Sequence, residues 1–350
     1  MRSTNSRRRS RLGVGGALLT LAVGVSAVCG PAVAEPLPVQ TSDPTSESPA
    51  DIARSSGSGS GSSGSDGPDG STAPPGSNDW SCTPNAEHPE PVVLVHGTWG
   101  NQNAWDVLAP QLKARGYCVF SLNYGKDTSS LMGAKRGSYG NGDIRQSAKE
   151  LAAFVDQVLN ATKASRVDIV AHSQGGPMTR QYLRFEGGVS RVDPSRNKVR
   201  KLITLGATNH GTTMDGLGAL ASGSSSGSAG SSSGSGSSSG SAGGPVARVV
   251  GLASVQQLVG SDFITRLNAD GDTDAGIDYT VVATHADKIS TPPQATFLEA
   301  GPGASVRNLW VQDLCPTDTF EHGKLPQSPT VGFIVQSALD PSYPGPVCNG

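Results

Sequence analysis

Residues 167–176 read VDIVAHSQGG. The first five are mostly branched and apolar, which is typical of a buried strand, and helix-compatible sequence follows the stretch. Ser173 lies between small residues, with Ala171 two positions before it and Gly175 two positions after it. This pattern predicts a nucleophile elbow, in which a serine occupies a strained turn between a strand and a helix that nearly touch. Because Ala171 stands where glycine is more usual, the prediction depends also on the preceding strand pattern.

Strand and helix patterns alternate on both sides of the elbow. The other expected strands are 91–95, 117–123, 199–205, 277–283 and 306–311, and the expected helices are 104–115, 141–160, the segment from the elbow through Leu183, and 330–339. Strands that are apolar on both faces belong in the interior of a parallel sheet. The alternation predicts a doubly wound, mostly parallel α/β sheet.

The N-terminal segment, 1–34, has the organisation of an export signal. Five arginines precede the apolar run 12–28, and Ala32-Val33-Ala34 is a cleavage pattern. Cleavage after Ala34 removes no acidic residue and takes the formal net charge from −2 to −7. From the signal pattern we expect a secreted, extracellular protein. From the net charge we expect no nucleic-acid partner, because a negative chain is not attracted to a polyanion. An uncleaved membrane anchor is the alternative, although the apolar run is short for a bilayer span.

Two tracts rich in small polar residues divide the chain further. Residues 35–79 are Pro, Ser, Gly and Asp with almost no large apolar side chain, which predicts a disordered tether before a domain spanning 80–350. The second tract, 221–244, lies inside that domain and is almost pure Gly and Ser. We expect a flexible cap insertion over about 213–270 that covers a site, with one or two short helices in 245–267.

Four cysteines remain after the loss of Cys29 with the signal, namely Cys82, Cys118, Cys315 and Cys348. An even number in an exported chain indicates two disulfides. We favour the pairs Cys82–Cys118 and Cys315–Cys348 among the three connectivities, because each pair brackets one structural unit. Free buried thiols are the alternative.

A serine hydroxyl needs a base to take its proton, and the base needs a group that orients it. In an elbow protein these follow in the order Ser, acid, His. Asp287 follows the fifth expected strand and His322 follows the sixth, so both lie at the carboxyl ends of strands, where open α/β sheets place their sites. Asp278 and Asp313 are weaker candidates for the acid, because the first begins a strand and the second comes too late.

Five other histidines compete with His322 for the role of base. His88 precedes the expected fold, His96 lies in the loop after the first strand, His172 is in the elbow and should point away from the serine, His210 comes too early in the order, and His285 ends its strand.

The tetrahedral intermediate of acyl transfer needs hydrogen-bond donors at its negative oxygen, and removing one donor costs about 3 kcal/mol in the barrier. We expect the backbone N–H of Gln174, directly after the nucleophile, to be one donor. The backbone N–H of Thr98, after His96 and Gly97, is expected to be the other. The predicted oxyanion hole therefore joins the elbow to the loop after the first strand.

Several further motifs accompany the elbow: 95–98 (VHGT), 116–119 (GYCV), 122–125 (LNYG), 209–212 (NHGT), 311–316 (VQDLCP) and Glu321-His322. With these motifs the chain from about Trp80 to Asp340 resembles the class 2 bacterial secreted lipases of the α/β-hydrolase fold. The resemblance implies hydrolysis of fatty-acyl esters, with Ser173, Asp287 and His322 as the triad. The tract 221–244 looks like an addition to the family's cap.

The expected partner is thus a lipid or ester substrate, met at a lipid–water interface by a monomeric chain that needs no cofactor and no metal. Residues 270–274 (DGDTD) resemble the start of a calcium loop, but Ala275 stands where that loop needs Gly and Val281 where it needs Glu. We interpret this stretch as a solvated acidic turn. Two other functions stay open: an acyltransferase that uses the same triad, and a non-catalytic surface binding protein on the hydrolase scaffold.

Overall fold

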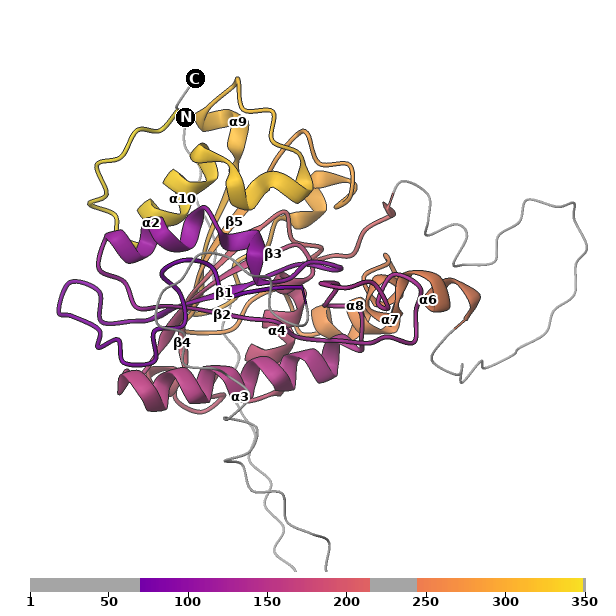
Figure 1. Cartoon of the computed structure of the whole chain (residues 1–350), viewed down its shortest axis with the longest axis horizontal. Coiled ribbons are helices and arrows are strands. Elements are labelled where there is room, and N and C mark those ends of the chain that lie inside the picture. The colour runs from indigo at the N-terminus through magenta and orange to yellow at the C-terminus, as the bar shows by residue number, and fades with distance from the viewer. Residues whose placement is uncertain (1–69, 215–243, 349–350) are drawn as a thin grey trace, which may run out of the picture. The chain divides into compact units, whose positions relative to one another are not determined.

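A parallel sheet of six strands forms the centre of the computed structural model, which describes residues 70–214 and 244–348 (Figure 1). The strands are β1 (Val92–Val95), β2 (Val119–Leu122), β3 (Val167–His172), β4 (Val199–Leu205), β5 (Asp278–Ala283) and β6 (Ser305–Trp310). They stand in the order β2-β1-β3-β4-β5-β6, and every neighbouring pair is parallel. The predicted doubly wound α/β sheet is confirmed.

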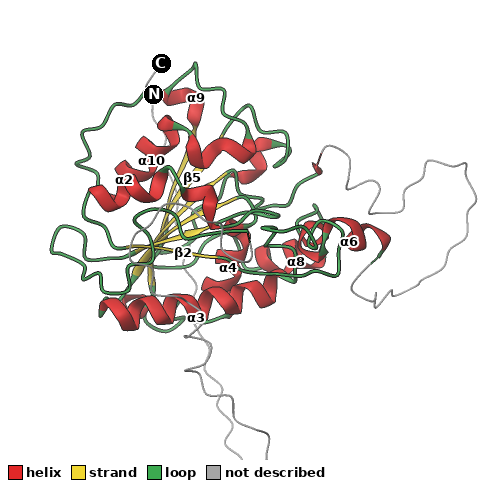
Figure 2. Ribbon diagram, viewed as in Figure 1, coloured by secondary structure: helices red, strands yellow, loops and turns green. Residues whose placement is uncertain are grey.

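Helices cover both faces of this sheet (Figure 2). The longer ones are α2 (Leu108–Ala114), α3 (Ile144–Thr162), α4 (Gly175–Phe185) and α10 (Pro329–Leu339), and the shorter ones are α6 (Pro245–Val250), α7 (Leu252–Gln256), α8 (Asp262–Asn268) and α9 (Val311–Leu314). Short 3₁₀ helices are η2 (Gln102–Trp105), η3 (Pro194–Arg196), η5 (Pro293–Thr296) and η6 (His322–Gln327). No helix in the described part of the chain is long and apolar enough to span a membrane.

Strand β1 is apolar on both faces because each face of the sheet has its own core. Alternate residues of a strand point to opposite sides. Val92 therefore packs in one core with side chains of α2 and α10, while Val93 packs in the other with side chains of α3 and α4. Both valines are fully buried. This arrangement explains why the sequence of β1 lacks a polar face.

Two expected elements differ in detail from the structure. The helix predicted over 104–115 is divided into η2 and α2. The segment 245–267 forms three helices rather than one or two, and Gly251, with φ of 92°, separates the first two. A Cβ at Gly251 would lie 2.8 Å from the carbonyl oxygen of Asn141, so only glycine fits at this break between the two helices.

Residues 70–79 belong to the packed unit, which corrects the predicted start of the domain near Trp80. Asn78 lies beside β2, an edge strand of the sheet. Its side chain donates to the carbonyl oxygen of Ser121 at 2.9 Å and accepts from the N–H of Ser121 at 2.8 Å. The amide side chain of Asn78 thus makes the pair of hydrogen bonds that the backbone of a neighbouring strand would make.

His88 is likewise part of the fold, because its ring stacks on Tyr117 with centroids 3.7 Å apart.

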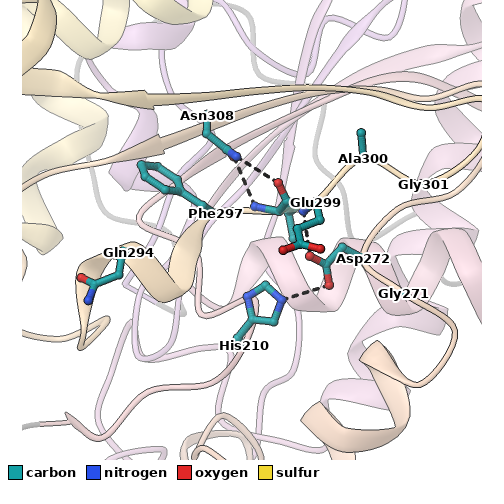
Figure 3. A pocket seen from close by; sticks show the side chains of 10 residues that line it. His210, Gly271, Asp272, Gln294, Phe297, Glu299, Ala300, Gly301 and Asn308 are labelled. Carbon is teal, nitrogen blue, oxygen red and sulfur yellow. Dashed lines mark hydrogen bonds and ion pairs between the residues drawn. The ribbon is translucent and has the colours of Figure 1, made fainter. Parts of the chain in front are cut away.

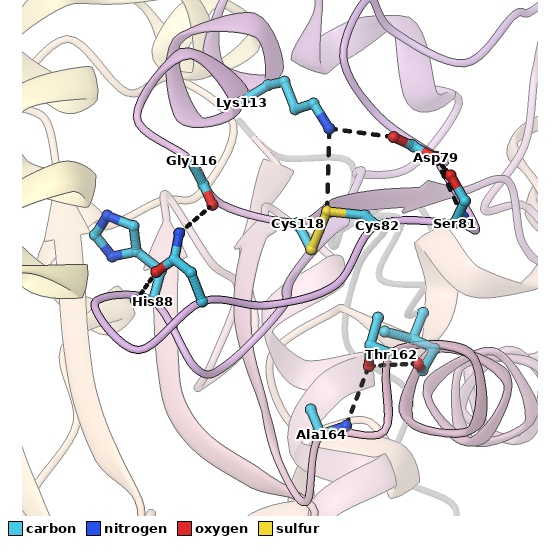
Figure 4. Close-up of a disulfide and its surroundings, with 11 residues drawn as sticks. Asp79, Ser81, Cys82, His88, Lys113, Gly116, Cys118, Thr162 and Ala164 are labelled. Atoms are coloured by element: carbon cyan, nitrogen blue, oxygen red, sulfur yellow. Dashed lines mark hydrogen bonds and ion pairs between the residues drawn. A yellow bond between two sulfur atoms is a disulfide. The ribbon is translucent and has the colours of Figure 1, made fainter.

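Both expected disulfides are present, between Cys82 and Cys118 and between Cys315 and Cys348. Figure 4 shows the first, which joins the segment before β1 to the residue before β2, close to Lys113 and Asp79. The predicted pairing is confirmed. The expected export signal (1–34), the tether up to residue 69 and the Gly/Ser tract up to residue 243 lie outside the described residues.

Candidate active site

Ser173 lies at the sharp turn between β3 and α4, with a backbone φ of 55°. The turn brings α4 against the end of β1, because a Cβ at Gly175 would lie only 2.8 Å from the carbonyl oxygen of Val95. Ala171 is fully buried in β3, so the methyl group that departs from the usual motif is accommodated there. The predicted elbow geometry is confirmed.

The structure brings Ser173, Asp287 and His322 into one hydrogen-bonded row. His322 Nε2 is 2.9 Å from Ser173 Oγ, and His322 Nδ1 is 2.8 Å from Asp287 Oδ2. Nδ1–H donates to the carboxylate, which leaves Nε2 free to accept the serine O–H. All three residues are buried, with at most 7% of each exposed.

The aspartate is held by the loop that follows it. Its Oδ1 accepts from the backbone N–H groups of Ile289 and Ser290, both at 2.8 Å. Gly206, at the end of β4, leaves room for the acid and the base together. A Cβ there would lie 3.1 Å from Asp287 Oδ2 and 3.2 Å from His322 Nδ1, and its φ is 55°. Sequence reasoning missed Gly206, although a glycine directly after a strand was a visible signal.

The side chain of His172 lies against His322, a contact that was not expected from the sequence. Its Nε2 is 2.9 Å from the carbonyl oxygen of His322, and the two rings are tilted with centroids 4.9 Å apart. Burial, and then the neighbouring His322, lower the pKa of His172 to about 3. The ring is therefore neutral, and its Nε2–H donates to His322. No sequence pattern indicated this contact.

His96 supports the loop after β1 and is not placed to act as a base. Its Nδ1–H donates to the carbonyl oxygen of Gly97 at 2.8 Å, and its ring stacks on Tyr124. The hydroxyl of Tyr124 donates to the His96 carbonyl oxygen at 2.6 Å. Complete burial lowers the pKa of His96 to about 4, so it too is neutral.

The two expected oxyanion donors lie beside the nucleophile. A Cβ at Gly97 would be 2.7 Å from Ser173 Cβ, so only glycine allows this loop to approach the elbow. Within the described residues, the backbone N–H groups of Thr98 and Gln174 donate to no other protein group. Gln174 precedes α4, and a helix N-terminus favours negative charge. Both amides are thus available to an anionic oxygen.

An open cleft of about 700 Å³ is lined by residues other than Ser173, Asp287 and His322 (Figure 3). His210 lines it, with Nδ1 2.8 Å from the carbonyl oxygen of Ala295 and Nε2 2.9 Å from Asp272. Both partners are acceptors, so the protonated ring, which has two N–H groups, fits this place best. The bond to Asp272 raises the pKa of His210. This histidine joins two loops, and both of its ring nitrogens have partners other than Ser173.

The acidic turn 270–274 is only partly solvated, which corrects its interpretation. Asp272 binds His210, and Asp274 pairs with the buried Arg184 at 3.3 Å. Arg184 also donates to the carbonyl oxygens of Leu267 and Gly271. The Arg184 guanidinium therefore already neutralises the Asp274 carboxylate. Among the described residues no cluster of three or more His, Cys, Asp or Glu could hold a metal ion.

Comparisons with known proteins agree with this geometry. A family model described as Lipase (class 2) matches residues 89–299. Triacylglycerol lipases of Pseudarthrobacter phenanthrenivorans and Burkholderia plantarii are each 31% identical to this chain over 128 residues, or 35% of its length. The match spans 34% and 30% of those relatives, about a third of each.

A crystal structure of lipase B from Aspergillus fumigatus is similar with a TM-score of 0.54 at 19% identity, over 78% of this chain and 56% of that one. At this identity the likeness concerns the fold alone. It confirms the α/β-hydrolase fold.

Proposed function

Because this chain belongs to the class 2 lipase family, we propose that it is a serine hydrolase that cleaves carboxylic esters of fatty acids. The observation that carries the proposal is the row of hydrogen bonds from Asp287 through His322 to Ser173. Relatives named triacylglycerol lipases support an acylglycerol as the substrate.

In the first half of the reaction, Ser173 Oγ attacks the ester carbonyl carbon while its proton moves to His322 Nε2. Asp287 stabilises the imidazolium through Nδ1–H. The carbonyl oxygen becomes negative and accepts from the amides of Thr98 and Gln174. Collapse of the intermediate transfers the proton to the leaving alcohol and leaves an acyl group on Ser173. Water, deprotonated by His322, then releases the acid and restores the serine.

Exposed apolar side chains near the site support action at a lipid–water interface. Leu131 is 70% exposed and Val249 47% exposed, and their segments are joined by the bond from the Leu131 N–H to the Arg248 carbonyl oxygen. The carbonyl oxygen of Val250 accepts from the indole N–H of Trp99, the residue after Thr98, at 2.8 Å. Ile289, 43% exposed, is two residues from Asp287. Apolar groups around a site offer contact with an acyl chain or a lipid surface.

Export is part of the same proposal. The N-terminal segment has the pattern of a cleaved signal, and disulfides form in oxidising compartments outside the cytosol. The chain carries two of them. Mass analysis of protein collected from the culture medium should find the mature N-terminus at Glu35, and a cell-retained chain that keeps its first 34 residues would contradict export.

The decisive experiment is the substitution Ser173→Ala. We expect turnover of p-nitrophenyl butyrate to fall by about 10⁶-fold, as for loss of a triad nucleophile, while the melting temperature stays close to that of the unchanged chain. A fluorophosphonate probe should label the unchanged chain and not this variant. Ser129→Ala, at an exposed serine, is the control. Full activity of Ser173→Ala would reject the proposal, and product analysis with an added alcohol separates hydrolysis from acyl transfer.

A further inference from the structure

The side chain of Thr98 receives two hydrogen bonds that together fix its role. We infer that Gln257, from the segment after the Gly/Ser tract, is a positioning residue for the oxyanion hole: with Gln174 it holds the Thr98 hydroxyl so that its hydrogen points to the developing oxyanion. Thr98 would then supply a side-chain donor in addition to its backbone N–H. This inference rests on the proposed ester hydrolysis and adds to it a donor and the residue that orients it.

The two bonds come from amide nitrogens. Thr98 Oγ1 is 2.9 Å from Gln174 Nε2 and 2.8 Å from Gln257 Nε2. An amide nitrogen donates and does not accept, so the hydroxyl oxygen is the acceptor in both bonds. A hydroxyl oxygen has two lone pairs and one hydrogen. Both lone pairs are thus occupied, and the hydrogen remains for a third partner.

The orientation of both amides is fixed by other groups. Gln174 Nε2 also lies 2.9 Å from the carbonyl oxygen of Gly140, which only accepts. Gln257 Nε2 lies 3.0 Å from the carbonyl oxygen of Ala253. Reversing either amide would set two oxygens against each other. The Thr98 oxygen therefore faces N–H groups on both sides.

Gln257 is anchored independently of Thr98. Its Oε1 accepts from the hydroxyl of Thr208 at 3.0 Å, and it is the C-terminal cap residue of α7. Only 1% of Gln257 is exposed, so its amide is not free to turn to solvent. The residue therefore transmits the position of α7 to the loop beside the nucleophile.

The remaining hydrogen of the Thr98 hydroxyl has no acceptor among the described residues. Thr98 itself is half-buried and follows Gly97, whose backbone lies against Ser173. The acceptor that the reaction creates at this place is the negative oxygen of the intermediate. A donor held before the reaction stabilises that charge without reorganisation.

The test measures kcat and KM for p-nitrophenyl butyrate in four variants. Thr98→Val keeps shape and backbone N–H but removes the hydroxyl, and should lower kcat on the order of 100-fold with KM little changed. Thr98→Ser should restore most of kcat. Gln257→Leu should lower kcat about tenfold, since one of two orienting bonds is lost. The double variant Thr98→Val with Gln257→Leu should match Thr98→Val alone, because Gln257 acts through the hydroxyl.

Gln256→Leu is the matched control. This neighbouring glutamine accepts from the Ile144 N–H and donates to Asp143, so it supports α3 and does not touch Thr98. Its loss should lower the melting temperature and leave kcat unchanged.

Wild-type kcat in Thr98→Val would overturn the inference, and so would a full tenfold effect of Gln257→Leu in the Thr98→Val background. A wild-type chain that hydrolyses no ester contradicts the proposed function itself, which is a separate result.

Discussion

Ser173 is held in a backbone conformation that its side chain does not favour. A non-glycine residue with φ of 55° costs on the order of 1–3 kcal/mol, and persists only where the surroundings impose it. Here β3 ends on one side and Gly175 packs under β1 on the other. The strain presents the hydroxyl to His322, so the conformation serves the chemistry that we propose.

Asp287 is the residue whose charge the mechanism requires. The variant Asp287→Asn retains the size of the side chain but no longer favours the tautomer with Nδ1–H, so we expect kcat to fall about 10⁴-fold. Steady-state hydrolysis of p-nitrophenyl butyrate measures kcat for this variant and for the unchanged chain. Asp313→Asn, at an exposed acid on α9, should leave kcat unchanged. Equal losses in both variants would show that the acid had been wrongly assigned.

His172 supports His322, the residue that we propose as the base. The variant His172→Phe keeps a ring of similar size but leaves the carbonyl oxygen of His322 without its donor. A buried acceptor left unpaired costs about 1–3 kcal/mol, so urea unfolding should show a loss of that size. Stability equal to that of the unchanged chain would mean that the contact contributes nothing.

Among the elements, the loops after β4 and β5 are joined by His210. The pKa of this histidine is raised by Asp272, against the opposing effects of burial and of Arg180. A histidine whose folded pKa lies above its unfolded value of 6.5 stabilises the fold fully below pH 6.5 and loses that contribution as pH rises through the folded pKa. The pKa of Asp272 is lowered from its usual value of 3.8, so the stability that its carboxylate contributes is lost only as pH falls below 3.8.

We therefore expect the melting temperature of the unchanged chain to exceed that of His210→Gln most between pH 4 and 6.5, with the difference shrinking toward pH 9. Thermal unfolding at intervals of half a pH unit measures it. His285→Gln is the control, because that ring stacks on Trp310 and has no carboxylate partner among the described residues. A difference that is constant with pH would contradict the coupling of His210 to Asp272.

For the molecule as a whole, the disulfide Cys82–Cys118 closes a loop of 36 residues. Loop-closure entropy assigns about 4 kcal/mol to a loop of this length. The double variant Cys82→Ala with Cys118→Ala should lose a free energy of unfolding of that order, measured by urea unfolding under oxidising conditions. A reducing agent, which also opens Cys315–Cys348, should destabilise the unchanged chain by at least as much. If removal of the pair changed nothing, the segment before β1 would be held by its hydrogen bonds to β2 alone.

The order of strands and helices, the elbow at Ser173 and the positions of Asp287 and His322 could be read from the sequence. These signals are local: apolar periodicity marks buried elements, small residues mark the tight turn, and parallel strands bring their carboxyl ends to one edge. Even so, the start of the domain was placed too late, because Asn78 pairs with a strand edge through a side chain that has no apolar signature.

What only the tertiary structure decided are the contacts that join distant parts of the chain around the nucleophile. His172 meets a carbonyl 150 residues away, and Gln257 meets a hydroxyl 159 residues away. Gly206 is needed because an acid and a base meet above it. Each of these contacts depends on how the helices, strands and loops are arranged in the folded protein. A single polar residue or glycine has no periodic sequence pattern from which its contact partner could be predicted. The order of residues along the chain therefore determined the fold and the residues that we propose to react, while packing determined how those residues are held.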